Sequence, residues 1–463
     1  MSHSPSQPAR YRAAWRWHMY AGIYVIPFML MLSITGLIML LYQPVIAPAF
    51  HSNLLTVQPA NNEYVSWQQQ LNRVKAEYPE ASITQFRLPE SPSQSSHFTV
   101  KNTAGENINV YVNPYNSEIL GSNSKDQSLY ALADEIHGTF LFGKTGDALI
   151  ELAAGYTLVL ILTGLFMWWP RQQKHWYRLF LPQLNSKGRS LWKELHVSTG
   201  AWLAVALLFL SITGLSWTGI WGAKIIQPWN TFPTGVFGGV PTSDKTHASL
   251  NPGVIEEIPW NLEQAPLPLS GSHAGTQVTP PGTAVNLDSV TSFAKQLNMQ
   301  SFRVNLPRDN DGVYSIVAAT MSKDRISPVD DRTLHIDQYS GKLLMDIQFK
   351  DYSLIAKAMA VGIPLHMGLW GTANLILNIT ICVLTLFLCV SGIVLWWKRR
   401  PAQSGLNLNP PPAISASRWN TAFVIWTIIA VCFPLTGASL IVIWLLEQLF
   451  SRLFKRTSKL QRS

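Results

Sequence analysis

The hexapeptide Leu-Ser-Ile-Thr-Gly-Leu occurs at residues 32–37 and again, unchanged, at 210–215. Each copy lies inside an apolar run that contains no acidic or basic side chain, 19–42 for the first and 197–223 for the second. A helix that crosses the bilayer core needs about 20 largely apolar residues. The repeated hexapeptide therefore predicts two membrane-spanning helices that are related by an internal duplication.

Three further runs are long enough to cross a bilayer. They cover 148–169, whose only charged residue is Glu151, and 358–397 and 419–446, which carry no charge. Only 13% of the 463 residues are charged, 47% are apolar and three are cysteine, which excludes a disordered or disulfide-stapled chain. The first run is longer than the roughly 7–15-residue core of a signal peptide, so we expect an uncleaved anchor in an integral membrane protein.

Lysine and arginine accumulate beside the apolar runs, before the first run and within 170–195 and 398–418. This distribution accounts for the formal charge of +9 without nucleic-acid binding, and it places the short basic loops in the cytoplasm. Both long connections then lie outside. The basic tail does not fit this rule, because five spans would place it outside the cytoplasm. It would fit if Pro434 broke the fifth run so that this run did not cross the membrane. We favour five spans.

The predicted organisation has ten segments. They are the cytoplasmic N-terminus with the first span (1–42), an outer module (43–136), the second span (137–169), a cytoplasmic loop (170–195), the third span (196–223), an outer module (224–357), the fourth span (358–397), a cytoplasmic loop (398–418), the fifth span (419–449) and a basic tail (450–463). Each outer region holds an amphipathic helical pattern, at 65–78 and 287–297, followed by alternating strands. The predicted fold is a mainly α-helical membrane protein with duplicated helix pairs, two extracytoplasmic α+β modules and a fifth C-terminal helix.

Histidine takes part in the duplication. His18 lies 18 residues before Gly36, and His196 lies 18 residues before Gly214. Each of these histidines is followed four residues later by glycine, Gly22 in the first half and Gly200 in the second. One histidine at the end of an apolar run is usually interfacial or pore-facing, but the repeat favours a shared role.

A second pair opens the other two runs. His137-Gly138 precedes Thr163-Gly164, and His366 precedes Ser391-Gly392, with 27 and 26 residues between each histidine and the later glycine. Along antiparallel helices, this pair would lie near the outer face and the first pair near the cytoplasmic face. The remaining histidines, in polar loops or strands, are expected at the solvated surface: His3, His51, His97, His175, His247, His273 and His335.

Two imidazoles at one depth, one from each half, suit the axial ligation of a haem. We therefore predict two non-covalent b-type haems, an inner haem held by His18 and His196 and an outer haem held by His137 and His366. Gly22 and Gly200 would leave room for a porphyrin. Two histidines without carboxylate or thiol make a poor zinc or iron site. No Cys-x-x-Cys-His motif and no dinucleotide fingerprint is present, so an electron donor would have to be a separate cytoplasmic partner.

Several motifs resemble those of the PepSY-associated transmembrane helix family. They are the stretch His-Gly-Thr-Phe-Leu-Phe-Gly-Lys at 137–144, the ending Trp-Trp-Pro-Arg at 168–171, Trp-Lys-Glu-Leu-His at 192–196 and His-Met-Gly-Leu-Trp-Gly at 366–371. The resemblance covers the four main helices and, more loosely, the outer modules. It implies an iron-regulated bacterial inner-membrane protein, PepSY-like outer modules and reduction of ferric siderophores by a di-haem protein.

The resulting hypothesis is a haem-dependent oxidoreductase that carries electrons from a cytoplasmic donor to a periplasmic ferric siderophore. Two alternatives remain open. One is a non-redox regulator whose outer modules bind peptides or peptidases. The other is a siderophore or metal permease with histidines along its path. A colourless purified protein would remove the redox hypothesis.

Overall fold

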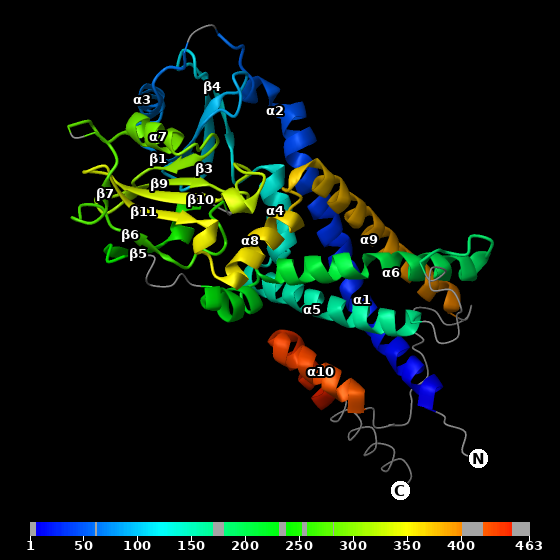
Figure 1. The fold of residues 1–463 in the computed structure, drawn as a ribbon. Helices are drawn as coiled ribbons and strands as arrows, with labels where there is room; N and C mark the ends of the chain where they lie inside the picture. Colours follow the sequence, from blue (N-terminus) through cyan, green and yellow to red (C-terminus); the bar gives the residue numbers. More distant parts are fainter. Residues whose placement is uncertain are drawn as a thin grey trace, which may run out of the picture. The chain divides into compact units, whose positions relative to one another are not determined.

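The computed structural model describes residues 6–60, 63–169, 180–230, 238–251, 257–280, 282–400 and 420–446. The predicted tail at 450–463 and most of the loop at 398–418 lie outside these residues. The chain divides into two compact units, each assembled from both halves of the duplication (Figure 1). The helical unit comprises 1–34, 136–226 and 380–463, and the sheet unit comprises 35–135 and 227–379.

Four helices are long and apolar enough to cross a membrane. They lie within 10–55, 143–168, 188–215 and 371–399. The first begins as α1 (Ser6–Leu41) and continues through the π-helical η1 (Tyr42–Ile46) and α2 (Ala47–Leu55), and the others are α5 (Gly143–Trp168), α6 (Gly188–Leu215) and α9 (Gly371–Arg399). The shortest, with 26 residues, is about 39 Å long, which exceeds the roughly 30 Å apolar core of a bilayer. The chain is therefore a multi-pass membrane protein.

The fifth apolar run differs from the expectation of one continuous span. It forms two short helices, α10 (Asn420–Cys432) and a helix at Pro434–Leu446, which meet at the proline that interrupts the backbone ladder. Each has a length of about 20 Å, which is less than the thickness of the apolar core. The second packs closely on α5, since a Cβ on Gly155 would lie 1.9 Å from the hydroxyl oxygen of Thr436.

Glu151, the acid within the second apolar run, has backbone partners. Its carboxylate accepts hydrogen bonds from the amides of Ile220 and Trp221 at 3.2 and 3.1 Å, and Asp147 accepts one from the amide of Gly219 at 2.9 Å. These amides lie in the turn after α6 and at the first residue of the π-helical η3 (Trp221–Ile226), where the start of a helix leaves amides without intrahelical acceptors. The two carboxylates of α5 thus tie down the end of α6.

A short helix precedes the second and the fourth span. These are α4 (Leu129–Thr139) and α8 (Leu354–His366). A turn with left-handed backbone follows each, with φ of 51° and 62° at Phe140 and Leu141, and of 70° at Gly368. The run expected as a single segment at 358–397 is therefore two helices, because the glycine permits a sharp turn. His137 and His366 lie near the ends of these short helices and do not begin the spans.

The two outer modules form one nine-stranded sheet with the order β4-β3-β2-β1-β8-β9-β10-β11-β7. The first module contributes α3 (Trp67–Glu77), β1 (Ser82–Arg87), β2 (Ser96–Lys101), β3 (Asn107–Val112) and β4 (Ile119–Ser124). The second contributes α7 (Leu287–Gln296), β8 (Arg303–Asn305), β9 (Val313–Ala318), β10 (Arg332–Asp337) and β11 (Lys342–Gln348), and β7 (Thr276–Gln277) borders β11. The modules join through the antiparallel pair β1 and β8.

Reciprocal caps fasten α3 to α7, which lie side by side over the sheet (Figure 1). The carboxylate of Asp288 accepts the amide of Trp67 at 2.7 Å, and the side chain of Gln68 accepts the amide of Leu287 at 3.1 Å. Both helices bury apolar faces in the same core, against Phe86 and other strand residues. Each helix therefore satisfies amides at the start of the other.

The connection at 228–281, which the sequence indicated as surface, also supplies buried residues to the opposite face of the sheet. Leu250, Ile258 and Leu262 pack with Val317 and Met345 in a second apolar core. Its described residues include η4 (Gln227–Asn230), β5 (Thr242–Thr246), η6 (His247–Leu250) and β6 (Pro266–Pro268). Two further short 3-10 helices are η7 (Pro328–Asp330) and η8 (Phe349–Asp351).

Candidate functional site

His18 on α1 is held by a hydroxyl of α5. Its Nδ1 lies 3.0 Å from the hydroxyl oxygen of Thr163. That hydroxyl donates its own hydrogen to the carbonyl of Val159 at 2.6 Å. Because its one hydrogen is already used, the hydroxyl accepts from the imidazole, so Nδ1 carries the proton and Nε2 carries a lone pair.

His196 on α6 repeats this arrangement in the other half of the chain. Its Nδ1 lies 2.8 Å from the hydroxyl oxygen of Ser391 on α9, and that hydroxyl donates to the carbonyl of Leu388 at 2.9 Å. The same argument places the proton on Nδ1 and leaves Nε2 as a lone pair. A neutral imidazole ligates a metal through such a lone pair, and the partner of the other nitrogen fixes its tautomer.

Each of these hydroxyl residues is followed by a glycine that lies against the histidine ring. A Cβ on Gly164 would lie 3.3 Å from Cε1 of His18, and a Cβ on Gly392 would lie 3.5 Å from Cε1 of His196. Sequence reasoning found the hydroxyl-glycine pairs as repeats but assigned them no role. Their signal was their similar spacing from His137 and His366, at 27 and 26 residues to the glycine. In the structure the glycines instead lie against the rings of His18 and His196.

The two imidazoles come from different halves and lie near each other. Their ring centroids are 6.4 Å apart and their planes are inclined by 85°. A metal–imidazole bond is about 2.0 Å and a ring nitrogen lies about 1.1 Å from its centroid, so two axial imidazoles on one metal place their centroids about 6.2 Å apart. Within the described residues no three His, Cys, Asp or Glu side chains gather as a metal site. The spacing and the two-imidazole donor set fit a haem iron.

Gly22 and Gly200 follow the two histidines by one helical turn. A Cβ on Gly22 would meet Leu160 at 3.8 Å, and a Cβ on Gly200 would meet Leu388 at 3.6 Å. Both are ordinary van der Waals distances, so the contacts within the described residues do not require glycine at either position. Their predicted role in making room for a porphyrin stays a prediction.

His137 and His366 belong to different units and are described separately. His137 lies in the last turn of α4 and is half-buried. His366 is the last residue of α8 and is also half-buried. Asn378 of α9 donates to the carbonyls of His366 and Leu365 at 2.8 and 2.7 Å, and Asn374 donates to the latter at 3.0 Å. These amides, which sequence reasoning missed, hold the turn after His366.

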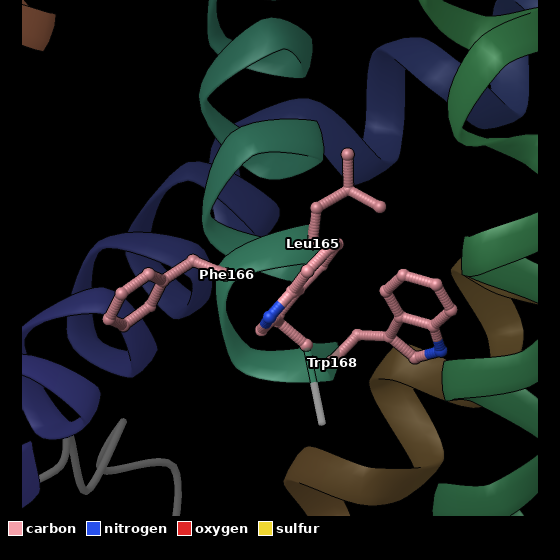
Figure 2. Close-up of a pocket in the computed structure, with 4 residues that line it drawn as sticks. Leu165, Phe166 and Trp168 are labelled. Atoms are coloured by element: carbon pink, nitrogen blue, oxygen red, sulfur yellow. The ribbon is translucent and has the colours of Figure 1, made fainter. Parts of the chain in front are cut away.

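An apolar pocket lies at the C-terminal end of α5. It has a volume of about 490 Å³ and is lined by Leu165, Phe166, Trp168 and Trp169 (Figure 2). The indole of Trp168 also packs edge-on against Phe180, with ring centroids 5.2 Å apart. Tryptophans at the end of a span are typical of anchors at the membrane interface.

Two histidines expected at the surface form a buried pair in the sheet unit. The Nε2 atoms of His247 and His335 lie 2.9 Å apart, and neither residue is exposed. Nδ1 of His247 donates to the carbonyl of Ala265 at 2.8 Å, and Nδ1 of His335 pairs with the hydroxyl of Ser315 at 2.9 Å. The loop that carries His247 folds over the sheet, which its polar sequence did not indicate.

The family comparison agrees with the motifs. The family model described as the PepSY-associated TM region matches residues 15–399, which include three of the four candidate spans, most of the first one (10–55) and the sheet unit. No curated protein matches the chain. The chain belongs to the family of the PepSY-associated TM region.

Proposed function

We propose that the protein is a haem-dependent oxidoreductase of the bacterial inner membrane, which carries electrons from a cytoplasmic donor to a ferric siderophore in the periplasm. The observation that carries this proposal is the matched pair His18 and His196. Both imidazoles have their proton fixed on Nδ1, and their ring spacing suits two axial ligands of one metal.

The chain's own residues have distinct tasks in this proposal. His18 and His196 would hold the inner haem, Thr163 and Ser391 orient the two rings, and a bound haem supplies a one-electron iron couple. The hydroxyls act through the histidines, because they fix which nitrogen is free to ligate.

His137 and His366 are proposed as ligands of an outer haem, from their equivalent positions at the ends of α4 and α8. The sheet unit would receive the acceptor. Reduction adds one electron to each ferric ion, and chelators hold the ferrous product less tightly because its charge is smaller. The basic short loops favour a cytoplasmic N-terminus, so an external reporter should be active after Ser122 and inactive after Asn185.

An absorption spectrum of the purified protein tests the cofactor. We expect a haem spectrum that sharpens on reduction with dithionite, with two haems per chain. His18→Ala and His196→Ala should each remove the same haem, while His137→Ala and His366→Ala remove the other and the control His273→Ala removes neither. A colourless protein would contradict the proposal and favour the non-redox alternative. Loss of different haems from His18→Ala and His196→Ala would contradict the pairing.

A second measurement tests the acceptor. Dithionite-reduced protein should be reoxidised faster by a ferric siderophore than by ferric citrate or oxygen, with ferrous iron trapped by a colorimetric chelator. His366→Ala should slow this step while the inner haem stays reducible. Equal rates with every ferric chelate would remove the siderophore from the proposal and leave the electron path in place.

A further inference from the structure

A row of basic side chains crosses the sheet where the two modules join. On the paired strands β2, β1 and β8, the register places His97 opposite Arg87, and Arg87 opposite Arg303. Neighbouring residues along these strands, Phe86 and Val304, lie in the apolar core beneath α3 and α7. Since side chains alternate between the faces of a sheet, the basic row lies on the opposite face.

Acidic side chains neutralise most of this charge. Arg303 contacts Glu257 at 2.5 Å and Asp324 at 3.2 Å, Lys125 contacts Glu257 at 2.8 Å, and Arg87 contacts Glu90. Burial would otherwise raise the pKa of Glu257, but the charges of Arg303 and Lys125 reverse that effect and lower it strongly. Each of these cations therefore has a carboxylate partner.

Lys323 adds a further cation to the same cluster. It lies in the turn after β9, with a left-handed φ of 65°, and its Nζ lies 5.5 Å from the ring centroid of Tyr130. Among the described residues, no carboxylate comes within salt-bridge distance of this ammonium group. Four cations (Arg87, Lys125, Arg303 and Lys323) thus face three carboxylates (Glu90, Glu257 and Asp324), which leaves one excess positive charge.

The environment of Lys323 disfavours that charge. Burial, and after it the charges of the Arg87 and Arg303 guanidinium groups, lower the pKa of its ammonium to about 8. A buried charge without a counter-ion is costly, and a strained non-glycine backbone is typical of functional turns. If these charges served only to stabilise the fold, three cations would be enough for the three carboxylates. A bound anion would supply the negative charge that the fourth cation lacks.

We propose that Lys323, together with Arg87, Arg303 and His97, forms a binding site for a small ligand that carries carboxylate groups. Lysine supplies a point charge for such a carboxylate. Arg303 already donates to Glu257, Asp324 and the carbonyl of Ser322, so it acts through its positive charge, which adds to the attraction for an anion. That this ligand is the anionic portion of the ferric chelate rests on the function proposed above. The site would then select negatively charged chelates for the sheet unit.

Binding of gallium citrate to the full-length protein in detergent tests this site. Gallium citrate is a redox-inert analogue of ferric citrate, so calorimetry reports binding without electron transfer. We expect Lys323→Met and Lys323→Gln to weaken binding at least about tenfold, which is the loss of one charge-assisted contact. Lys323→Arg should retain most of the affinity, and the control Lys101→Met, at an exposed lysine of β2, should retain all of it.

Three results would overturn the site. They are no binding of gallium citrate by the unaltered protein, unchanged affinity in a neutral Lys323 variant that melts at the normal temperature, and equal affinity for a cationic gallium trihydroxamate. Two neutral variants are used because either of them is enough for the test if the other does not fold. The haem absorbance of the same samples separates this outcome from failure of the proposed function, because a coloured protein that does not bind the anion contradicts the site alone.

Discussion

Two histidine pairs, one in each unit, use the same side chain in opposite ways. In the helical unit, the ring centroids of His18 and His196 are 6.4 Å apart and each Nδ1 bonds a hydroxyl. In the sheet unit, the centroids of His247 and His335 are 4.9 Å apart and the Nε2 atoms bond each other. The first spacing matches that of two imidazoles on one metal, whereas the second pair is closed by a hydrogen bond. The partners of the ring nitrogens, more than burial, distinguish a potential ligand from a structural histidine.

The tautomers of the two pairs also differ. His18 and His196 carry their protons on the same nitrogen, so their free lone pairs are equivalent. His247 donates from Nδ1 to a carbonyl, so its Nε2 must accept from Nε2–H of His335. The latter ring then accepts the hydroxyl hydrogen of Ser315 through Nδ1. This pair is satisfied without any ligand.

Removing one member of each pair should have opposite consequences, and this is the largest expected effect. His335→Ala leaves buried partners unsatisfied and creates a cavity, which should lower the free energy of unfolding of the sheet unit by about 2–4 kcal/mol. Haem content should not change. His18→Ala should remove the inner haem and leave the melting of the sheet unit unchanged. Haem loss from His335→Ala in a folded protein would contradict the distinction.

Acid should break the pair in the sheet unit. Burial lowers the pKa of His247 to about 4, and burial followed by the neighbouring His247 lowers that of His335. The unfolded chain binds these protons near pH 6.5, so the stabilisation is complete above that pH and is lost as pH falls toward 4. At pH 5 the loss for His247 alone is about 2 kcal/mol.

Thermal unfolding at pH 7 and pH 5 measures this loss. His247→Gln should reduce the difference between the two melting temperatures, whereas His273→Gln in the same unit should leave it unchanged. An acid sensitivity that persists fully in His247→Gln would assign the effect to other groups.

The hydroxyl partners of the inner pair give the smallest expected effect. Thr163→Val and Ser391→Ala remove the group that fixes the ring tautomer, and should weaken haem binding about tenfold, near 1.4 kcal/mol. Thr157→Val is the matched control, because Thr157 donates to a backbone carbonyl of the same helix at 2.9 Å and bonds no histidine within the described residues. Equal weakening by Thr157→Val, measured by haem titration, would attribute the change to helix packing.

Much of the architecture was accessible from the sequence. The apolar runs predicted five spans, and four of them are confirmed as helices long and apolar enough to cross a membrane. The hexapeptide repeat lies in two of these four. The equal spacing of His18 and His196 from the repeated glycines predicted that both lie at one depth, since the rise per residue of a helix is constant. The family resemblance is confirmed by the match over residues 15–399.

Pattern alone determined the duplication, the apolar spans and the candidate histidines, because these depend on composition and on spacing along single helices. The tertiary structure decided what depends on contacts between distant segments. It joined the two outer modules through β1 and β8, fixed the inner rings against Thr163 and Ser391 and buried His247 with His335. It also brought Lys323 to two arginines. Strand pairing, tautomer and burial are set by partners far along the chain, and local periodicity carries no information about them.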